Sequence, residues 1–424
     1  MASKMLMGDM PELMENILKH LNNEIYSLYS CALISPLITL PFKLFLESGA
    51  ILNEFDLYNS EFLKFELEIF HSLEQNVQFY SRLQYLSLSI LSNFGIENIA
   101  ELLRVMTKNT MEISALRLLF HSEFESKLIH TLSPALIHFI KSQEQLRKFI
   151  FDVDGCTEFY GIISALESQK NTLQEVILDG CGFSIEFEAL NNCKNLETLR
   201  ILNCDAELLK ILDYNINNIS TLEISYFQDD EPIIVQILEN IGILLQRLKV
   251  ETGTIISAVG EESLLLEALK SFCPNIIYLY IEIIWVSTQL IELIGNLQKL
   301  QFLSLGYIYH TPKEERKIQV MQFAKILPLT LQYLNIALSM PDTLLDPFID
   351  ILLDHCNAPL KKLLIGSCNI NNEKNTKALI RYCTRIRTLN YVGIVKYYDL
   401  DDDIRNELEK YVTLVPYKHI VVNC

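Results

Sequence analysis

The sequence predicts an α/β fold built from stacked repeats, with parallel strands in one layer and helices in the other. The chain has 424 residues, half of them apolar, yet it contains only 14 Gly and 12 Pro. So few turn-forming residues in a long apolar chain indicate regular repetition rather than several independent domains. A second observation is a six-residue pattern, apolar-x-x-apolar-x-apolar, that recurs thirteen times at intervals of 23 to 33 residues. The third observation is that apolar residues in the segments between these matches recur at the spacing of a helix.

Each match predicts a short strand. A single match carries little information in such an apolar chain, so the prediction depends on the regular spacing of the matches. Along a strand, alternate side chains face opposite sides. The pattern therefore buries one side of each strand and leaves the other side free. The matches begin at Leu52, Leu83, Ile113, Leu146, Leu173, Leu196, Ile219, Leu245, Ile276, Leu300, Leu331, Leu360 and Ile386.

The segments between the matches predict amphipathic helices. We expect helices over residues 158–169, 232–241, 261–271, 316–326, 347–356 and 374–383. Asp346-Pro347 is typical of a helix start, with an N-cap followed by Pro at the first helical position. One strand and one helix cannot bury their apolar faces alone, so neighbouring units must stack into a solenoid.

The cysteines indicate the type of repeat. Cys193-x-x-Leu196-x-x-Leu199-x-Ile201-x-x-Cys204 resembles the core of a cysteine-containing leucine-rich repeat. The resemblance implies a leucine-rich-repeat solenoid of about 12–13 repeats over residues 49–424, with a curved parallel sheet inside and helices outside. Eight of the ten cysteines fall at or near repeat positions: 156, 181, 193, 204, 273, 356, 368 and 383. We expect them to be free, buried thiols.

Residues 1–48 differ from the repeats and predict a short helical segment. Met10-Pro11-Glu12-Leu13, the pair Ile17-Leu18, Leu21 and the run from Leu28 to Ser35 resemble the F-box. In F-box/leucine-rich-repeat proteins this segment binds the Skp-type adaptor of an SCF ubiquitin ligase, which connects it indirectly to a cullin. The resemblance implies that the adaptor-binding residues are Pro11, Leu13, Ile17, Leu18, Leu21, Leu28, Cys31 and Ile34.

The chain departs from the family pattern directly after this run. The family has a basic residue after the Ser and a Trp two positions later. Here Pro36-Leu37-Ile38 follows Ser35, and the only Trp is Trp285. Two interpretations therefore stay open. One is a substrate-recognition subunit of an SCF-type ligase, and the other is a repeat scaffold with a decayed F-box and no ligase role. The two short helices could also simply cap the first repeat.

Composition excludes several other functions. A net charge of −18 disfavours nucleic-acid binding, which needs a basic face. No apolar run is long enough to cross a membrane, and no signal peptide is recognisable, so we expect a cytoplasmic and/or nuclear protein. The stretch Asp152-x-Asp154 after an apolar strand resembles the first motif of haloacid-dehalogenase phosphatases, but Cys156 stands where that family has Thr or Val. We expect no catalytic residue, metal or cofactor.

Partner binding is expected on the free side of the strands, which in a curved solenoid is the concave face. The side chains there include three cations on an acidic chain and four aromatic residues on successive strands. Aromatic residues and Arg are enriched at the energetic centres of protein interfaces. We therefore predict that an unknown protein substrate binds at Arg200, Arg247, Lys249, Tyr278, Tyr280, Phe302 and Tyr333.

Overall fold

The computed structural model describes residues 51–59, 75, 77–90, 96–120, 126–156, 158–213, 218–227, 231–252, 263–285, 287–309, 313–336, 349–366, 373–395 and 400–422. Residues 1–50 lie outside this set. The predicted adaptor-binding segment, with Pro11, Leu13, Ile17, Leu18, Leu21, Leu28, Cys31 and Ile34, is therefore outside the described residues.

The described residues form a parallel sheet in which each strand pairs with its neighbours along the chain, in the order β1 to β14. This arrangement confirms the predicted α/β leucine-rich-repeat solenoid. The strands are β1 Glu54–Asn59, β2 Tyr85–Ile90, β3 Ala115–Phe120, β4 Lys148–Cys156, β5 Glu175–Cys181, β6 Thr198–Leu202, β7 Thr221–Phe227, β8 Arg247–Thr252, β9 Tyr278–Trp285, β10 Phe302–Tyr309, β11 Tyr333–Asn335, β12 Lys362–Gly366, β13 Tyr391–Val395 and β14 Thr413–Pro416.

Twelve of the thirteen predicted matches have the expected register, because each of these strands begins two residues after the match does. The match predicted at Ile386 was wrong by three residues. Leu363 pairs with Val392, so Leu389 opens this repeat. The Ile386 amide instead donates to the carbonyl of Tyr382 at 2.7 Å, at the end of the preceding helix.

Strand β14 was not predicted. Leu414 pairs with Val392, which gives the repeat the pattern Tyr411-x-x-Leu414-x-Pro416. Tyr411 and Pro416 occupy the first and last positions of this pattern. All the predicted matches begin with Leu or Ile, and none of them ends with Pro. Pro lacks a backbone donor and is confined to edge strands and strand ends. Its position at the last residue of β14 agrees with that restriction.

Helices connect successive strands. The α-helices are α6 Ile96–Asn109, α7 Ser126–Ser142, α8 Glu231–Ile241, α9 Leu264–Phe272, α10 Thr288–Asn296, α11 Lys313–Ile326, α12 Ile349–His355, α14 Glu373–Arg385 and α15 Asp402–Leu408. Short 3-10 helices are η2 Val77–Tyr80, η3 Ser164–Gln169, η4 Ile185–Asn192, η5 Ala206–Asp213 and η8 Tyr417–His419. The helix expected over 158–169 is only η3, because Tyr160 and Gly161 have φ values of 49° and 86° and interrupt it.

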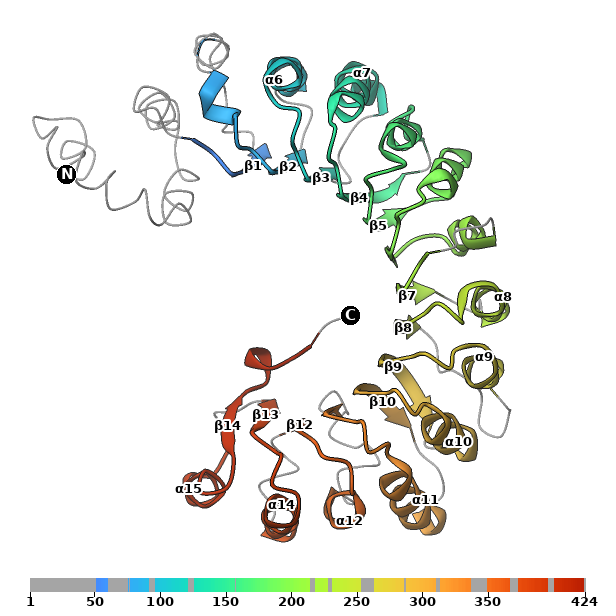
Figure 1. Ribbon diagram of the computed structural model, residues 1–424, viewed down its shortest axis with the longest axis vertical. Helices are drawn as coiled ribbons and strands as arrows, with labels where there is room; N and C mark the ends of the chain where they lie inside the picture. The colour runs from blue at the N-terminus through green and yellow to red at the C-terminus, as the bar shows by residue number, and fades with distance from the viewer. Residues whose placement is uncertain are drawn as a thin grey trace, which may run out of the picture. The chain divides into compact units, whose positions relative to one another are not determined.

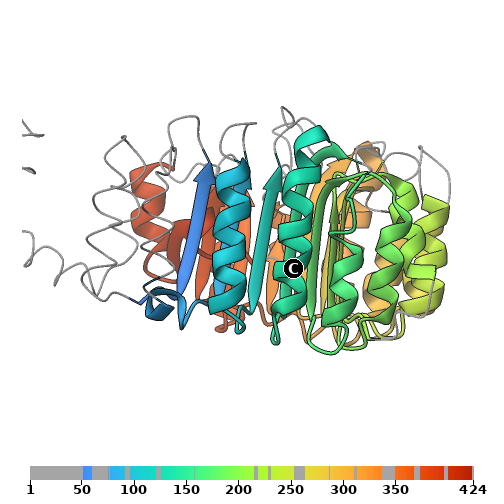
Figure 2. The same ribbon diagram turned by 90° about the horizontal axis from the view of Figure 1, so that it is seen from above.

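The chain forms two compact units. Unit 1 comprises residues 1–113 and 119–144, and unit 2 comprises residues 114–118 and 145–424. In unit 1, helices α6 and α7 run beside the strands (Figure 2). The buried Gln143 closes the end of α7: its Nε2 donates to the Thr110 carbonyl at 3.0 Å, and its Oε1 accepts from the Ile113 amide at 3.2 Å.

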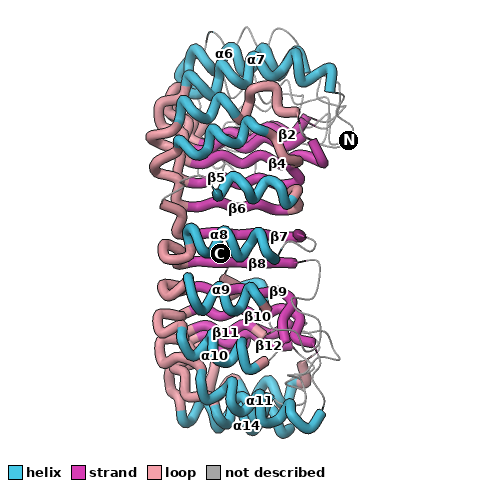
Figure 3. The backbone as a smooth tube through the Cα atoms, turned by 90° about the vertical axis from the view of Figure 1, so that its right-hand side faces the viewer, coloured by secondary structure: helices cyan, strands magenta, loops and turns pink. Residues whose placement is uncertain are grey.

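In unit 2 the helices lie along one side of the strands, and the strands face the inner side of a curve (Figure 1). Figure 3 shows α8 in front of strands β7 and β8, so the apolar side of the strands is covered by helices. In β6, Leu199 and Ile201 are fully buried, whereas Arg200 between them is half-buried and belongs to the opposite side. The free side of unit 2, called the strand face below, is therefore the side without helices.

Side chains just before each strand join neighbouring repeats. Asn195 Nδ2 donates to the Asn171 carbonyl at 2.6 Å, and Thr388 Oγ1 donates to the Leu360 carbonyl at 2.9 Å. The equivalent Thr330 Oγ1 donates to the Leu300 carbonyl at 2.8 Å. Each of these residues directly precedes the first core position of its repeat, so they satisfy turn carbonyls that stacking would otherwise bury.

The described cysteines are structural. Cys181, Cys193, Cys204, Cys273, Cys356 and Cys383 are buried thiols that take part in no disulfide. Burial raises the pKa of the Cys273 thiol to about 12 and that of Cys383 to about 11. A thiol with such a pKa is protonated at neutral pH and is a poor nucleophile.

Candidate protein-interaction surface

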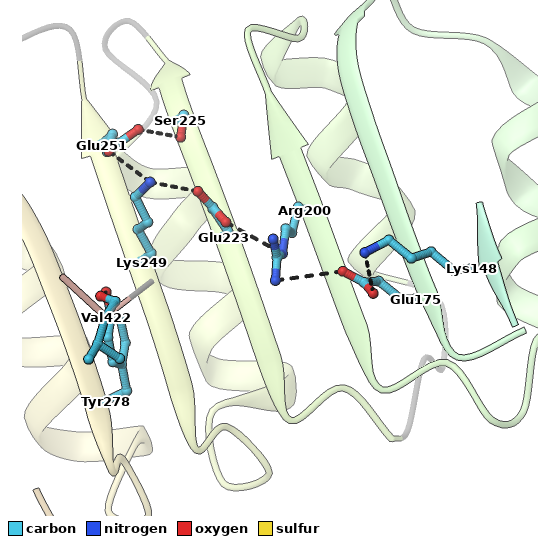
Figure 4. A network of polar contacts seen from close by, with 9 residues as sticks. All are labelled: Lys148, Glu175, Arg200, Glu223, Ser225, Lys249, Glu251, Tyr278 and Val422. Carbon is cyan, nitrogen blue, oxygen red and sulfur yellow. Dashed lines mark hydrogen bonds and ion pairs between the residues drawn. The ribbon is translucent and has the colours of Figure 1, made fainter. Parts of the chain in front are cut away.

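The strand face of unit 2 carries a row of alternating charges. We call it the charge ladder and define it as Lys148 on β4, Glu175 on β5, Arg200 on β6, Glu223 on β7, and Lys249 and Glu251 on β8. Figure 4 shows these side chains following one another across the strands. They come from consecutive repeats because the parallel register stacks equivalent positions: Lys148 pairs with Glu175, and Glu223 pairs with both Arg200 and Lys249.

Every cation of the ladder contacts a carboxylate. Lys148 Nζ lies 2.9 Å from Glu175, and Arg200 lies 3.6 Å from Glu175 and 3.5 Å from Glu223. Lys249 Nζ lies 2.7 Å from Glu223 and 2.9 Å from Glu251. Three cations thus meet three carboxylates, and the ladder has no net charge. Arg200 and Lys249, which were predicted to bind a partner, are already paired within the chain.

Glu223 is the most enclosed member of the ladder, with 10 % of its side chain exposed. It accepts a hydrogen bond from Lys249. Burial of the Lys249 ammonium lowers its pKa, but hydrogen bonds with Glu223 and Glu251 outweigh burial and hold the pKa above the ordinary value. Ser225 Oγ donates to Glu251 at 2.7 Å and fixes the last carboxylate. Hydrogen bonds therefore fix the β7–β8 end of the ladder, whereas Arg200 joins the β5 and β7 carboxylates through ion-pair contacts of 3.5 to 3.6 Å.

Cations also connect the ladder to the aromatic residues of the next strand. The Arg247 guanidinium lies 4.7 Å from the centre of the Tyr278 ring, and Lys249 Nζ lies 5.3 Å from the centre of the Tyr280 ring. Both distances suit cation–π attraction. These contacts bring together four of the residues that the sequence predicted for substrate binding.

The predicted aromatic residues form a continuous row, which we call the aromatic row: Tyr278 and Tyr280 on β9, Phe302 on β10 and Tyr333 on β11. The Phe302 ring centre lies 6.3 Å from that of Tyr278 and 5.8 Å from that of Tyr333. The parallel register explains the contact, because Phe302 pairs directly with both tyrosines. The row nevertheless is not open to solvent. Tyr278 and Tyr333 are each only 1 % exposed.

The chain's own C-terminal segment, Tyr417–Val422, covers the aromatic row. After β14 the chain turns to the strand face, where η8 lies on the inner side of unit 2 (Figure 1). The Tyr278 hydroxyl donates to the Val422 carbonyl at 3.2 Å, and the Val422 amide donates to Tyr333 Oη at 3.2 Å. Figure 4 shows Val422 against Tyr278 beside the charge ladder. One residue of the segment thus has both of its main-chain groups bound by tyrosine hydroxyls.

Apolar contacts extend this attachment. Ile420 packs with Tyr333 and Leu364 in one buried cluster, and Val421 and Val422 pack against it. Burial of the Tyr333 hydroxyl raises its pKa to about 12, although the hydrogen bond from Val422 acts in the opposite direction. Next to it, Asn335 Nδ2 donates to Ser304 Oγ at 2.9 Å and lies 3.5 Å from the Tyr417 hydroxyl.

Gly393 on β13 provides the space that Ile420 occupies. A Cβ atom at this position would lie 3.0 Å from two side-chain carbons of Ile420 and 3.1 Å from Leu364 Cγ. Glycine inside a strand is typical of a close approach by another part of the protein. The floor of the site is therefore shaped to the C-terminal segment.

Neither the acidic partners of the ladder nor the C-terminal segment was predicted as part of the site. The acidic residues stand in the same outward positions as the cations, so the charge alternation is present in the pattern. Two sequence features could have predicted that the C-terminal segment packs on the strands. They are the apolar run Ile420–Val422 beyond the last repeat and Gly393 at an outward strand position. Together they indicate an apolar piece of chain that packs on a strand face.

The described residues offer little support for other kinds of site. In the part of the chain that the structure describes, no group of three or more His, Cys, Asp or Glu residues is arranged to hold a metal ion. Among the described helices, none combines the length and apolar character needed to cross a bilayer. Asp152 lies on β4 opposite Asp179 of β5, within the regular repeat stack.

Comparisons with known proteins give similar structures only. No family model matches the sequence, and no curated protein matches it. An internalin from Listeria monocytogenes is 13 % identical with a TM-score of 0.40, over 88 % of this chain and 84 % of that one. A chain of the yeast Rad7 and Elc1 complex is 13 % identical with a TM-score of 0.43, over 97 % of this chain and 99 % of that one. The leucine-rich-repeat protein LegL7 from Legionella pneumophila is 11 % identical with a TM-score of 0.37, over 87 % of this chain and 99 % of that one.

Proposed function

We propose that this chain is the substrate-recognition subunit of an SCF-type ubiquitin ligase, located in the cytoplasm or nucleus. Residues 8–36 bind a Skp-type adaptor, which links the chain to a cullin, and the strand face of unit 2 binds a protein substrate. The chain itself catalyses nothing. It raises the effective concentration of substrate lysines near the ubiquitin-carrying enzyme.

The observation that carries this proposal is the F-box-like run from Met10 to Ser35 placed before a leucine-rich-repeat solenoid. The strand face supports the receptor part of it. Stacked repeats present side chains from many strands on one continuous surface, which is the feature that solenoid proteins use for binding. On this chain that surface combines cations and carboxylates with aromatic rings that residues 417–422 cover, and aromatic and Arg side chains are common interface anchors.

Adaptor binding is tested by co-purification. The full chain and the variant Leu13→Asp/Ile17→Asp are each expressed with a Skp-type adaptor and purified under stringent washing. We expect the unchanged chain to retain the adaptor and the double variant to lose it, because two carboxylates cannot be buried in an apolar adaptor groove. Glu15→Gln, at a position that the F-box resemblance does not use, is the matched control. Absence of the adaptor from the unchanged chain would overturn the ligase assignment.

A second candidate function is a repeat scaffold that binds proteins without any ligase role. Pro36-Leu37-Ile38 favours it, because the F-box family has a basic residue and a Trp in this region. Under this alternative, Leu13→Asp/Ile17→Asp changes stability or has no effect and removes no partner selectively. The thermal midpoint and the set of co-purifying proteins, compared for the same two chains, separate the two functions.

A further inference from the structure

The C-terminal segment occupies a site with the properties of a peptide-binding surface. Both main-chain groups of Val422 are hydrogen-bonded by side chains, its carbonyl by Tyr278 and its amide by Tyr333. Main-chain hydrogen bonds do not depend on the identity of the bound residue, so a segment from another protein that places one residue here can form the same two bonds. Pockets for the neighbouring side chains then determine which segment binds.

Those pockets select aliphatic side chains. Ile420 fits over Gly393 and packs with Leu364, and Val421 and Val422 lie against the aromatic row. Asn335 lies near the Tyr417 hydroxyl at the other end of the segment. Arg247 and Lys249 are held against Tyr278 and Tyr280, so the rings that receive Val422 are fixed from the side of the charge ladder.

We infer that this surface binds a short, β-branched aliphatic segment of a protein partner, and that the chain's own Tyr417–Val422 is its intramolecular competitor. The inference rests on the proposed protein-binding function and identifies the chemistry of the segment recognised. Because the resident segment is tethered, its effective concentration is high. A partner segment binds with full affinity only when the resident segment leaves, and its apparent affinity falls by the fraction of molecules in which the site is open.

The test uses the full chain and a labelled peptide with the sequence of residues 417–422, Tyr-Lys-His-Ile-Val-Val. Replacing Ile420 in the chain by Asp places a charge where an apolar side chain is buried, so we expect the resident segment to dissociate. Hydrogen exchange of residues 417–422 reports this release. Fluorescence anisotropy then measures peptide binding, and we expect the Ile420→Asp chain to bind the peptide at least about tenfold more tightly than the unchanged chain.

Three further chains make the result specific. Adding Gly393→Val to Ile420→Asp fills the space that the peptide isoleucine needs, and adding Tyr278→Phe/Tyr333→Phe removes only the two hydroxyl oxygens. Both should weaken peptide binding, the first to the limit of detection and the second about fivefold to tenfold, as for the loss of about 1 kcal/mol. Tyr391→Phe, a tyrosine on β13 that is 41 % exposed, is the matched control and should change nothing.

The inference is overturned if the Ile420→Asp chain releases its segment, keeps its thermal midpoint within a few degrees and still fails to bind the peptide. It is also overturned if residues 417–422 exchange as slowly in the Ile420→Asp chain as in the unchanged chain. If Ile420→Asp unfolds the protein, a chain ending at Pro416 replaces it, because it keeps β14 but lacks the whole resident segment, Ile420 included. Peptide binding to this shorter chain that is no tighter than binding to the full chain likewise overturns the inference. Retention of the adaptor in the same preparations shows separately whether the ligase assignment stands.

Discussion

The strand face of unit 2 uses the same backbone positions in two different ways. On β4 to β8 the ladder positions carry charges, and each ladder cation is paired with a carboxylate of a neighbouring repeat. On β9 to β11 the outward positions carry aromatic rings, and these are covered by a distant piece of the same chain. Charges can pair across the strand spacing of about 5 Å, whereas three neighbouring rings leave an apolar patch that parallel strands cannot cover by themselves.

The difference explains what each part contributes. The side chains of the charge ladder are between 10 and 35 % exposed and the ladder is electrically neutral, so it is suited to give a partner specificity more than affinity. The aromatic row is dry and holds an aliphatic segment, so any affinity that it has for a partner is masked until the segment leaves.

The largest effect is expected from a variant that disturbs the packing of the C-terminal segment on the strand face. Gly393→Val places two methyl groups where Ile420 packs, and overpacking of this kind costs about 2 kcal/mol. We expect the free energy of unfolding to fall by that amount and residues 417–422 to exchange faster, while the ladder strands β5–β7 keep their exchange rates. Denaturant unfolding with hydrogen exchange by mass spectrometry measures both.

The control for this variant is Tyr391→Val on the same strand, where the side chain is 41 % exposed. It introduces the same residue without touching Ile420. Equal losses of stability in the two variants would contradict the close packing of Ile420 on Gly393.

A smaller effect is expected from breaking the ladder. Glu223→Gln keeps the size of the side chain but removes the charge shared by Arg200 and Lys249, which lie 3.5 and 2.7 Å away. Because the ladder is partly solvated, we expect a loss of about 1 kcal/mol in the free energy of unfolding. The exchange of residues 417–422 should stay unchanged. Glu197→Gln, outside the ladder, serves as the comparison variant.

A still smaller and more local effect is expected from Tyr333→Phe. It removes the oxygen that accepts from the Val422 amide, for a cost of about 0.5–1 kcal/mol. The pH dependence has a definite sign. The pKa of Tyr333 is raised from 10.0 to about 12, so its stabilising contribution is complete below pH 10 and disappears as the pH rises through about 12. The exchange protection of Val422, corrected for the intrinsic rate, should fall more steeply over this range in the unchanged chain than in Tyr333→Phe, which keeps only the Tyr278 hydroxyl as a partner of Val422.

Most of the fold was predictable because burial repeats with the sequence. Leu or Ile opened twelve matches in the correct register, since each such residue must enter the same apolar layer. The failures were at the C-terminal repeats. Ile386 fitted the pattern as well as Leu389 does, and only the pairing of Val392 with Leu363 decides between them. Tyr411 and Pro416 of β14 did not fit it at all.

The strand positions of the residues predicted for partner binding followed from the sequence, but the side chains that pair with them and the segment that covers them did not. The aromatic row follows from equivalent positions in neighbouring repeats, because a parallel register places Tyr278, Phe302 and Tyr333 side by side. The cover does not follow, since Val422 reaches Tyr278 across 144 residues of sequence. A repeat pattern relates residues in neighbouring repeats, so it cannot predict a contact between residues this far apart in the sequence.

The smallest expected effect is that of salt, which should change the contribution of the charge ladder to stability but not that of the covered aromatic row. At 1 M NaCl the Debye length is about 3 Å, close to the contact distances in the ladder, so the attraction between its partly buried charges is weakened but not removed. We expect the loss caused by Glu223→Gln to shrink by a few tenths of a kcal/mol between roughly 0.05 and 1 M NaCl, because the ladder then contributes less in the unchanged chain. The loss caused by Gly393→Val should stay constant, since Ile420 is held by apolar packing that sodium chloride does not screen. Denaturation of the unchanged chain and of both variants at the two salt concentrations gives six free energies of unfolding, four losses and one double difference. If that double difference were zero, the two halves of the face would share one kind of stabilisation, and the contrast between a charge-paired half and a chain-covered half would have no energetic basis.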